Sequence, residues 1–240
     1  IFPNKKIMSG LPEGLDAKYL LDKIKTEQKS LIHVARDDSR ALALKKAIEF
    51  FDPSVPVLNF PAWDCLPYDR VSPNIELSGL RVATLSKLIR FPTQINIIIT
   101  TVNAISQRVP PRYVIKDSSI FLKIGNSINT DEFKNSLIQI GYQSASSVIN
   151  KGDFAVRGGI IDVFPPNLAL PVRFDFFGDQ IDRARMFDPI TQLSEGAITE
   201  VLLCPVSEFF LNDLHINCFR SKYRHTFGAN GLNDPLYEAV

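Results

Sequence analysis

The chain has 240 residues, enough for one large domain or two modest ones with a sizeable hydrophobic core. Its 45% hydrophobic and 22% charged residues are typical of an ordinary globular protein. The net charge is only +1, which argues against a stand-alone nucleic-acid-binding protein, because such proteins are usually visibly basic.

The positions of the cysteines and histidines exclude the common disulfide and metal frameworks. Cys65, Cys204 and Cys218 are widely spaced and form no C-x-x-C pair. His33 lies in an apolar run, where a core residue is more common than a ligand. No apolar run approaches the roughly 20 residues that a membrane span needs, and residues 1–6 lack a signal-peptide core. We therefore expect a cytoplasmic protein without a metal site or a membrane segment.

Along the first half of the chain, helical and strand patterns alternate. Apolar residues recur at helical spacing over residues 16–26, 40–51 and 77–88, and short apolar runs predict strands over 31–35, 55–60 and 95–101. The last of these runs is apolar and β-branched almost throughout, as in a parallel sheet covered on both faces. This alternation predicts a three-layer α/β domain.

The pattern changes after residue 111. We expect short strands at residues 113–115 and 119–123, a helix that begins after Asn129 and runs to about residue 140, and then mostly strands and turns. These features predict an α+β domain inserted into, or appended to, the α/β domain. The expected domains are the α/β domain at 1–117, the α+β domain at 118–205 and a return into the α/β part at 206–240. The last segment has no closing signal, so we expect a piece of a longer protein.

The first strand-to-helix turn is expected at residues 8–16, MSGLPEGLD, where an α/β protein of this kind would bind nucleotide phosphates. Gly10 and Gly14 are present, but Pro12 removes an amide donor. Asp16 stands where a phosphate loop has the hydroxyl residue that follows its lysine, and its carboxylate would repel phosphate. No other catalytic motif is recognisable. We predict neither ATP hydrolysis nor any other enzymatic activity, and no cofactor.

The most informative segment is a predicted β-hairpin, with strands at 172–177 and 180–187 around the turn signal Gly178-Asp179. Alternation along the first strand gives one face to Val172, Phe174 and Phe176, and the other to Arg173, Asp175 and Phe177. On the returning strand we expect one face to carry Ile181, Arg183, Arg185 and Phe187. Upstream, Gly158-Gly159 predicts a bend between Arg157 and an apolar strand at residues 160–164.

Two interpretations of this pattern stay open on the residues alone. Arginine and aromatic side chains on one outward face are typical of a protein-docking surface. Alternatively, Phe177 belongs to the core and Arg173 pairs with Asp175 or with an aspartate of a neighbouring strand. The pattern by itself favours the second interpretation.

Three segments carry a resemblance to a known family. They are FPAWDCLPYDRVSP at residues 60–73, RGGIIDVFP at 157–165 and RFDFFGDQID at 173–182. The first resembles the W-[DE]-x-L-P-Y-[DE]-x-x-S-P signature of the transcription-repair coupling factor (Mfd) family, and the other two are shared in outline with the repair protein UvrB. The altered phosphate loop and the lack of a long aromatic hairpin favour the coupling factors. The likeness runs over nearly all of the chain.

This resemblance implies a degenerate helicase-type (RecA-like) domain with an inserted domain that recruits UvrA, the damage sensor of nucleotide excision repair. It implies that Arg157, Arg173 and Phe177 contact UvrA, with Arg183 and Arg185 as an extension of the patch. In the full-length protein it implies an ATP-dependent DNA translocase that binds RNA polymerase and double-stranded DNA. We also expect a downstream domain of that protein to cover the patch.

Two other functions remain as alternatives. One is a UvrB-type ATP-dependent DNA-binding and unwinding domain, which nucleotide binding would reveal. The other is a DNA-binding module that uses the same arginines on phosphates, with an affinity that falls steeply with salt.

Overall fold

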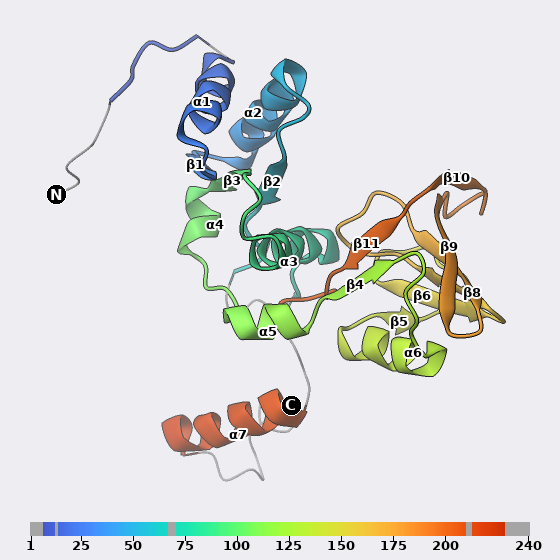
Figure 1. Cartoon of the computed structure of the whole chain (residues 1–240). Coiled ribbons are helices and arrows are strands. Elements are labelled where there is room, and N and C mark those ends of the chain that lie inside the picture. Colours follow the sequence, from blue (N-terminus) through green and yellow to red (C-terminus); the bar gives the residue numbers. More distant parts are fainter. Residues whose placement is uncertain (1–6, 13, 67–70, 210–212, 229–240) are drawn as a thin grey trace. The chain divides into compact units, whose positions relative to one another are not determined.

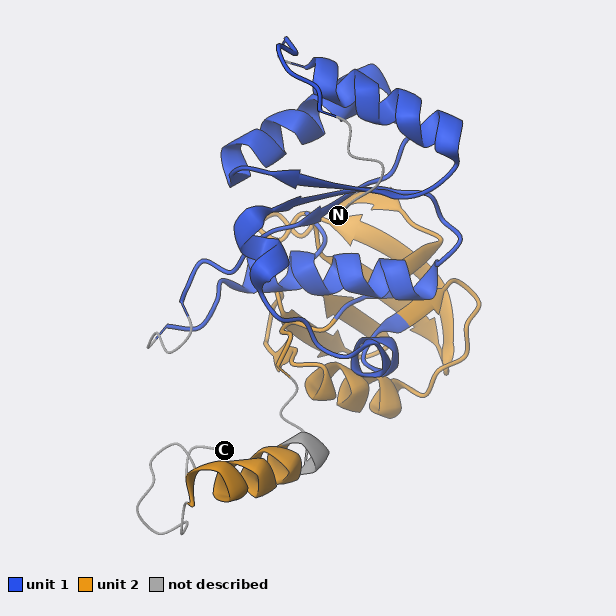
Figure 2. Cartoon of the chain, turned by 90° about the vertical axis from the view of Figure 1, so that its left-hand side faces the viewer, with its two compact units in different colours: residues 1–120, 166–169, 202–204 blue, residues 121–165, 170–201, 205–240 orange. Residues whose placement is uncertain are grey.

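The computed structural model of the protein describes residues 7–12, 14–66, 71–209 and 213–228. These residues form a mixed α/β structure (Figure 1). The chain divides into two compact units, shown in different colours in Figure 2. Unit 1 comprises residues 1–120, 166–169 and 202–204, and unit 2 comprises residues 121–165, 170–201 and 205–240.

Unit 1 contains a three-stranded parallel sheet in the order β1-β3-β2. Its elements are α1 (Leu15–Glu27), β1 (Leu31–Ala35), α2 (Asp38–Phe51), β2 (Val57–Phe60), α3 (Ile75–Arg90), β3 (Ile97–Thr101), α4 (Val102–Ser106) and α5 (Arg112–Asp117). The predicted alternation of helices and strands is thus confirmed through β3. The side chain of Asp37 caps α2 by accepting a hydrogen bond from the Arg40 amide, as its position before the helix predicts.

One part of the core of this unit lies between the sheet and helices α1 and α2. Ile97 and Ile99 of β3 pack there with apolar residues of α1 and α2, including Leu21 and Ile48. Every residue of β3 is buried, as the continuous apolar run predicted. On the other face, by contrast, the edge strand β1 leaves Ile32 and Val34 exposed, while Thr84 of α3 donates a hydrogen bond to the carbonyl of Asn59 at 2.7 Å. These alternating exposures give β1 the half-buried pattern of an edge strand.

A fully buried arginine, Arg81, packs against the first residues of the segment at 60–73. The Arg81 guanidinium lies 4.3 Å from the ring centroid of Phe60 and 4.9 Å from that of Trp63. It also donates to the carbonyl of Pro61 at 2.8 Å and to the side-chain oxygen of Gln107 at 3.1 Å. Stacking on two aromatic faces compensates part of the cost of burying the charge. Trp63 is therefore a packing residue, whereas residues 67–70 of the same segment lie outside the described ranges.

One sequence prediction for this unit was wrong. Residues 113–115 belong to helix α5, not to a strand, because the carbonyl of Pro111 accepts hydrogen bonds from the amides of Val114 and Ile115 and so starts a helical turn. A strand before the turn expected at residues 8–16 would fall mainly on residues 1–6, which lie outside the described residues, as does residue 13 of the turn. Ile7 and Met8, the first described residues, are exposed.

The second half of the chain forms a six-stranded sheet in the order β10-β9-β8-β7-β6-β5, and β4 pairs with β11 in a two-stranded sheet. Its elements are β4 (Ile120–Lys123), α6 (Thr130–Gln139), β5 (Gln143–Ser144), β6 (Asp153–Arg157), β7 (Ile160–Val163), β8 (Val172–Phe177), β9 (Gln180–Phe187), β10 (Ser194–Ala197), β11 (Glu200–Leu203) and α7 (Asp213–Phe227). Neighbouring strands from β6 to β10 are antiparallel, and β5 and β6 are parallel.

Helix α6 covers one face of the six-stranded sheet. The ring of Phe133 lies 6.0 Å from that of Phe174 and 6.2 Å from that of Phe176, measured between centroids. Val172 and Phe174 are buried on this face, as the alternation predicted, and Phe176 is half-buried. The arginines of β8 and β9 consequently project from the opposite face.

A β-bulge corrects the predicted alternation along β9. Asp175 pairs with Arg183 but Phe176 pairs with Ile181, so Asp182 is an extra residue in β9. The bulge turns Ile181 to the buried face, although simple alternation placed it beside Arg183. Arg183 and Arg185 remain opposite Asp175 and Arg173, on the face away from α6.

No helix among the described residues is both long and apolar enough to cross a membrane.

Gly79 offers a test of the packing in unit 1. A Cβ atom at this position of α3 would overlap the Cβ of Pro166, which belongs to the same unit. Alanine normally stabilises a helix by about 1 kcal/mol relative to glycine. We predict that Gly79→Ala instead lowers the free energy of unfolding by about 1–3 kcal/mol, because the overlap strains the core.

Urea denaturation followed by circular dichroism measures this change. Asn135→Ala at an exposed position of α6 is the control, and it should be neutral or slightly stabilising. An increase in stability for Gly79→Ala would contradict the packing described.

Candidate docking surface

The predicted site residues come together on the face of the six-stranded sheet away from α6. Pairing across the strands aligns two rows of side chains on this face. One row consists of Arg157, Ile160, Asp175 and Arg183. The other consists of Ala155, Asp162, Arg173 and Arg185. We call this face, together with Phe177, the arginine face.

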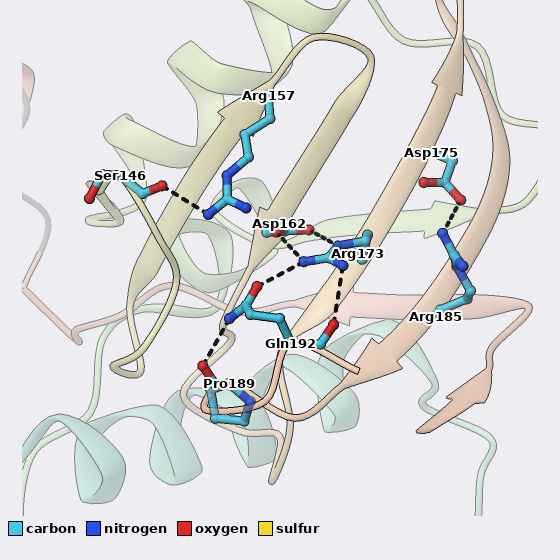
Figure 3. Close-up of polar contacts among 8 residues, drawn as sticks. All are labelled: Ser146, Arg157, Asp162, Arg173, Asp175, Arg185, Pro189 and Gln192. Carbon is cyan, nitrogen blue, oxygen red and sulfur yellow. Dashed lines mark hydrogen bonds and ion pairs between the residues drawn. The ribbon is translucent and has the colours of Figure 1, made fainter. Parts of the chain in front are cut away.

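Arg173 is held inside the arginine face by a hydrogen-bond network (Figure 3). Its Nε donates to Asp162 Oδ1 at 2.7 Å and its Nη2 to Asp162 Oδ2 at 2.8 Å, a bidentate pair between neighbouring strands. On its other side, Nη2 donates to the side-chain oxygen of Gln192 at 3.0 Å, and Nη1 to the Gln192 carbonyl at 3.5 Å. Figure 3 shows the guanidinium between these two residues.

Burial makes this pair structurally important. The side chain of Asp162 is 2% exposed and that of Arg173 only 16%. The Arg173 guanidinium also lies 4.4 Å from the ring centroid of Phe187, which is buried with Val148 and Phe164. The hydrogen bond with Asp162 raises the pKa of Arg173, so the charged form is favoured in this position. The aspartate pairing considered from the sequence is therefore present, but within a buried network and not on a solvated surface.

Arg157 lies at the end of β6 with its side chain exposed. Its guanidinium donates to the backbone carbonyl of Ser146 at 3.0 Å (Figure 3). No carboxylate in the described part of the chain lies within ion-pairing distance of it. A guanidinium held by one backbone carbonyl keeps most of its donors for an external acceptor.

Phe177 ends β8, immediately before the tight turn at Gly178, whose φ of 61° is a left-handed conformation. Alternation along β8 places its ring on the same face as Arg173 and Asp175. The residue is 84% exposed, so the interpretation of Phe177 as a core residue was wrong. A phenylalanine this exposed at a hairpin end leaves its apolar ring in contact with water and makes no contribution to the core.

The two arginines of β9 are paired with nearby carboxylates. Arg185 Nη2 lies 2.7 Å from Asp175 Oδ2, and Arg183 Nε lies 3.3 Å from Asp182 Oδ2. They lie in the same two rows as Arg157 and Arg173, where an extension of the patch was expected. Their positive charges are locally balanced.

Sequence reasoning missed Gln192, which binds Arg173 from the loop between β9 and β10. Its partner is nineteen positions away in the chain, and a single glutamine in a loop carries no pattern. Asp162, in contrast, was visible in one of the three segments that carried the family resemblance.

Two cavities lie at the start of α1 in unit 1. One has a volume of about 230 Å³ and is lined by Asp16, His33, Val34, Ala35, Arg36 and Arg40, and the other has about 100 Å³ and is lined by Gly14, Asp16, Arg40, Ala43, Leu44 and Ala47. Ligand pockets for drug-sized molecules are usually larger, about 300–1,000 Å³. Asp16 lines both cavities, and its carboxylate accepts the Ala17 amide at 2.9 Å, which occupies a donor that a phosphate would need. His33 is half-buried, and burial lowers its pKa. Among the residues that the structure describes, no cluster of His, Cys, Asp and Glu could hold a metal.

Comparison with known proteins identifies similar sequences. Residues 120–209 match the family described as the UvrB interaction domain. The chain is 33% identical to the transcription-repair-coupling factor of Escherichia coli (strain K12) over 88% of its own length and 18% of that protein. It is 32% identical to the factor of Haemophilus influenzae over 93% of its length and 19% of that protein, and 36% identical to the factor of Myxococcus xanthus over 76% and 16%. The chain thus spans about a fifth of the length of these relatives.

The buried pair predicts the effect of removing Arg173. Arg173→Ala would leave the Asp162 carboxylate buried without its main partner, so we expect the free energy of unfolding to fall by about 3–5 kcal/mol. Arg185→Ala removes a more exposed arginine from the same face, and it should cost only about 0.2–1 kcal/mol.

Urea denaturation of both variants, followed by circular dichroism, checks this difference. Similar small losses in the two variants would show that the Asp162–Arg173 pair contributes no more than a surface ion pair.

Proposed function

This chain is homologous over most of its length to the transcription-repair-coupling factors and carries a UvrB interaction domain, and we propose that this domain recruits UvrA to stalled RNA polymerase. The observation that carries the proposal is the arginine face, where the exposed Phe177 and the unneutralised Arg157 share one side of a rigid sheet. The proposal makes the chain an adaptor that acts by binding and not by catalysis.

The chemistry of the arginine face defines the partner surface. Burying the Phe177 side chain in an apolar pocket would contribute about 1.5–3 kcal/mol. The Arg157 guanidinium can bind a carboxylate through two parallel hydrogen bonds. We therefore propose that UvrA presents an apolar pocket beside an acidic side chain. Arg173, Arg183 and Arg185 belong to the same proposed surface.

The balance of charge favours a protein partner over DNA. Arg173, Arg183 and Arg185 each lie beside an aspartate, so the face offers few free cations for phosphates. DNA binding derives much of its affinity from neutralised phosphates. An aromatic side chain at the end of a hairpin suits a protein pocket better than a duplex backbone.

We also propose the finer architecture that the sequence predicted. The α/β part at residues 1–117 would be a degenerate helicase-type (RecA-like) three-layer domain, with the UvrA-binding domain at 118–205 and a return into the α/β part at 206–240. The small cavities with Asp16 support a domain of this kind without nucleotide binding. The chain spans about a fifth of its relatives, so contacts with RNA polymerase and double-stranded DNA, and a covering of the arginine face by another domain, are proposals for a longer protein.

A binding titration against purified UvrA tests the proposed function. We predict that Phe177→Ala and Arg157→Ala each weaken binding by about 2 kcal/mol, close to 30-fold, because hot-spot aromatic and arginine residues lose that much on truncation. Both side chains are exposed, so circular dichroism should show unchanged folding.

Matched controls separate the surface from general effects. Phe50→Ala removes another exposed phenylalanine, in α2, and Arg108→Ala another exposed arginine, and both lie in unit 1. Neither should change the affinity. Losses equal to those of the controls would refute the role of the arginine face, and no binding by the folded wild type would refute UvrA as the partner.

A further inference from the structure

The loop between β9 and β10, residues 188–193, has a defined conformation; we call it the Gln192 loop. The Asp188 carboxylate accepts hydrogen bonds from the amides of Ile190 at 2.9 Å and Thr191 at 2.6 Å, and from the Thr191 hydroxyl at 3.0 Å. The Asp188 amide donates to the Leu193 carbonyl at 2.9 Å, and the Gln192 amide to the Asp188 carbonyl at 2.8 Å. The three hydrogen bonds to the carboxylate lower the pKa of Asp188, and the bond from the Thr191 amide has the largest effect.

The Gln192 loop is fastened to the arginine face at one residue. Gln192 has a φ of 61°, in the left-handed region that few residues other than glycine adopt without cost. Its side-chain oxygen and backbone carbonyl both accept from Arg173, and its side-chain nitrogen donates to the Pro189 carbonyl at 2.8 Å (Figure 3). The hydrogen bonds with Arg173 compensate the cost of this backbone conformation.

The loop held in this way presents two large apolar side chains to solvent. Ile190 is 86% exposed and Leu193 is 69% exposed. They flank Gln192 and Thr191, whose polar groups are occupied within the loop and by Arg173. A rigid loop that exposes two aliphatic side chains is suited to burial against a partner, because little conformational entropy remains to be lost.

We propose that Ile190 and Leu193 form a second apolar contact of the docking surface, and that Arg173 is a positioning residue that holds them there through Gln192. This inference rests on the proposed function and assigns both contacts to the same partner, UvrA. Phe177 and the Gln192 loop lie toward opposite ends of the β8–β9 hairpin, with the charged rows between them.

The size of the surface supports one partner for both contacts. Phe177 lies four residues from Arg173 along β8, roughly 13 Å at about 3.3 Å per residue. The Gln192 loop adds to that length beyond Arg173. A standard interface buries about 800 Å² on each partner, which is broad enough to cover both ends of this face at once. Because the Gln192 loop adjoins the face that carries Phe177 and Arg157, we assign both contacts to the same partner, UvrA.

The hydrogen bonds of Arg173 explain how it positions the loop. A guanidinium has five N–H donors, and the structure gives Arg173 four hydrogen bonds, two to Asp162 and two to Gln192. Its side chain is also largely buried. One N–H of Nη1 is left over, while the other four donors hold the guanidinium between Asp162 and the loop.

The first test is a titration of the 240-residue chain against UvrA with the double variant Ile190→Ser/Leu193→Ser. We expect the dissociation constant to rise at least tenfold with unchanged circular dichroism. Ile138→Ser removes an exposed isoleucine from α6, on the other face of the sheet, and should leave the affinity unchanged. An unchanged affinity in the double variant overturns the inference.

The second test separates positioning from direct contact. Gln192→Ala removes the side-chain link to Arg173 but leaves the Asp162–Arg173 pair in place. We expect at least a fivefold loss of affinity and faster amide hydrogen exchange at residues 189–193, with unchanged exchange in β7 and β8. Wild-type affinity, or unchanged exchange in the loop, overturns the positioning role.

The outcomes distinguish this inference from the proposed function. If the wild type binds and Phe177→Ala weakens binding while Ile190→Ser/Leu193→Ser does not, only the second contact is refuted. If the folded wild type does not bind UvrA, both proposals fail. Sedimentation of the chain alone provides a further check, because self-association lost in the double variant would assign the loop to a second copy and overturn the inference.

Discussion

The bidentate pair between Asp162 and Arg173 is the interaction on which the rest of the arginine face depends. It joins β7 to β8 at the middle of the sheet, and through Gln192 it joins both strands to the loop after β9. Because the carboxylate is buried, neither partner can be lost without leaving a charge uncompensated. A single cross-strand pair thus fixes the conformation of segments that are distant in the sequence, and a surface fixed in this way can bind without first being ordered.

The two faces of the six-stranded sheet differ in their role. The face under α6 is closed by aromatic packing around Phe133 and so supplies stability, while the arginine face lies on the other side of the sheet. On that other face the charges are mostly matched within the domain, and Arg157 is the exposed guanidinium whose described partner is a backbone carbonyl. Selectivity for a partner can therefore rest on a small number of unmatched groups, while the matched pairs keep the sheet rigid and the net charge low.

Much of the fold followed from the sequence, because hydrophobic period and cap residues are local signals. The strands at 31–35, 172–177 and 180–187 have the predicted bounds, and Asn129 caps α6 as expected. The errors arose where an interaction without a sequence pattern determined the structure. The Pro111 carbonyl starts helix α5, and the bulge in β9 turns Ile181 to the buried face. For the candidate site, alternation along β8 was sufficient to place Arg173 and Phe177 on one face. It could not show how buried each would be, because Asp162 and Gln192 reach Arg173 only in the folded sheet.

The buried Arg81 has a consequence for spectroscopy. The chain contains one tryptophan, Trp63, and its ring lies against the Arg81 guanidinium in unit 1. Intrinsic tryptophan emission therefore reports the environment of that cation and its neighbours, while the arginine face, in unit 2, contains phenylalanine but no tryptophan. A shift in this emission during denaturation therefore reports the unfolding of unit 1 alone. Each unit can thus be observed separately, with fluorescence for one and an optical label placed on the docking domain for the other.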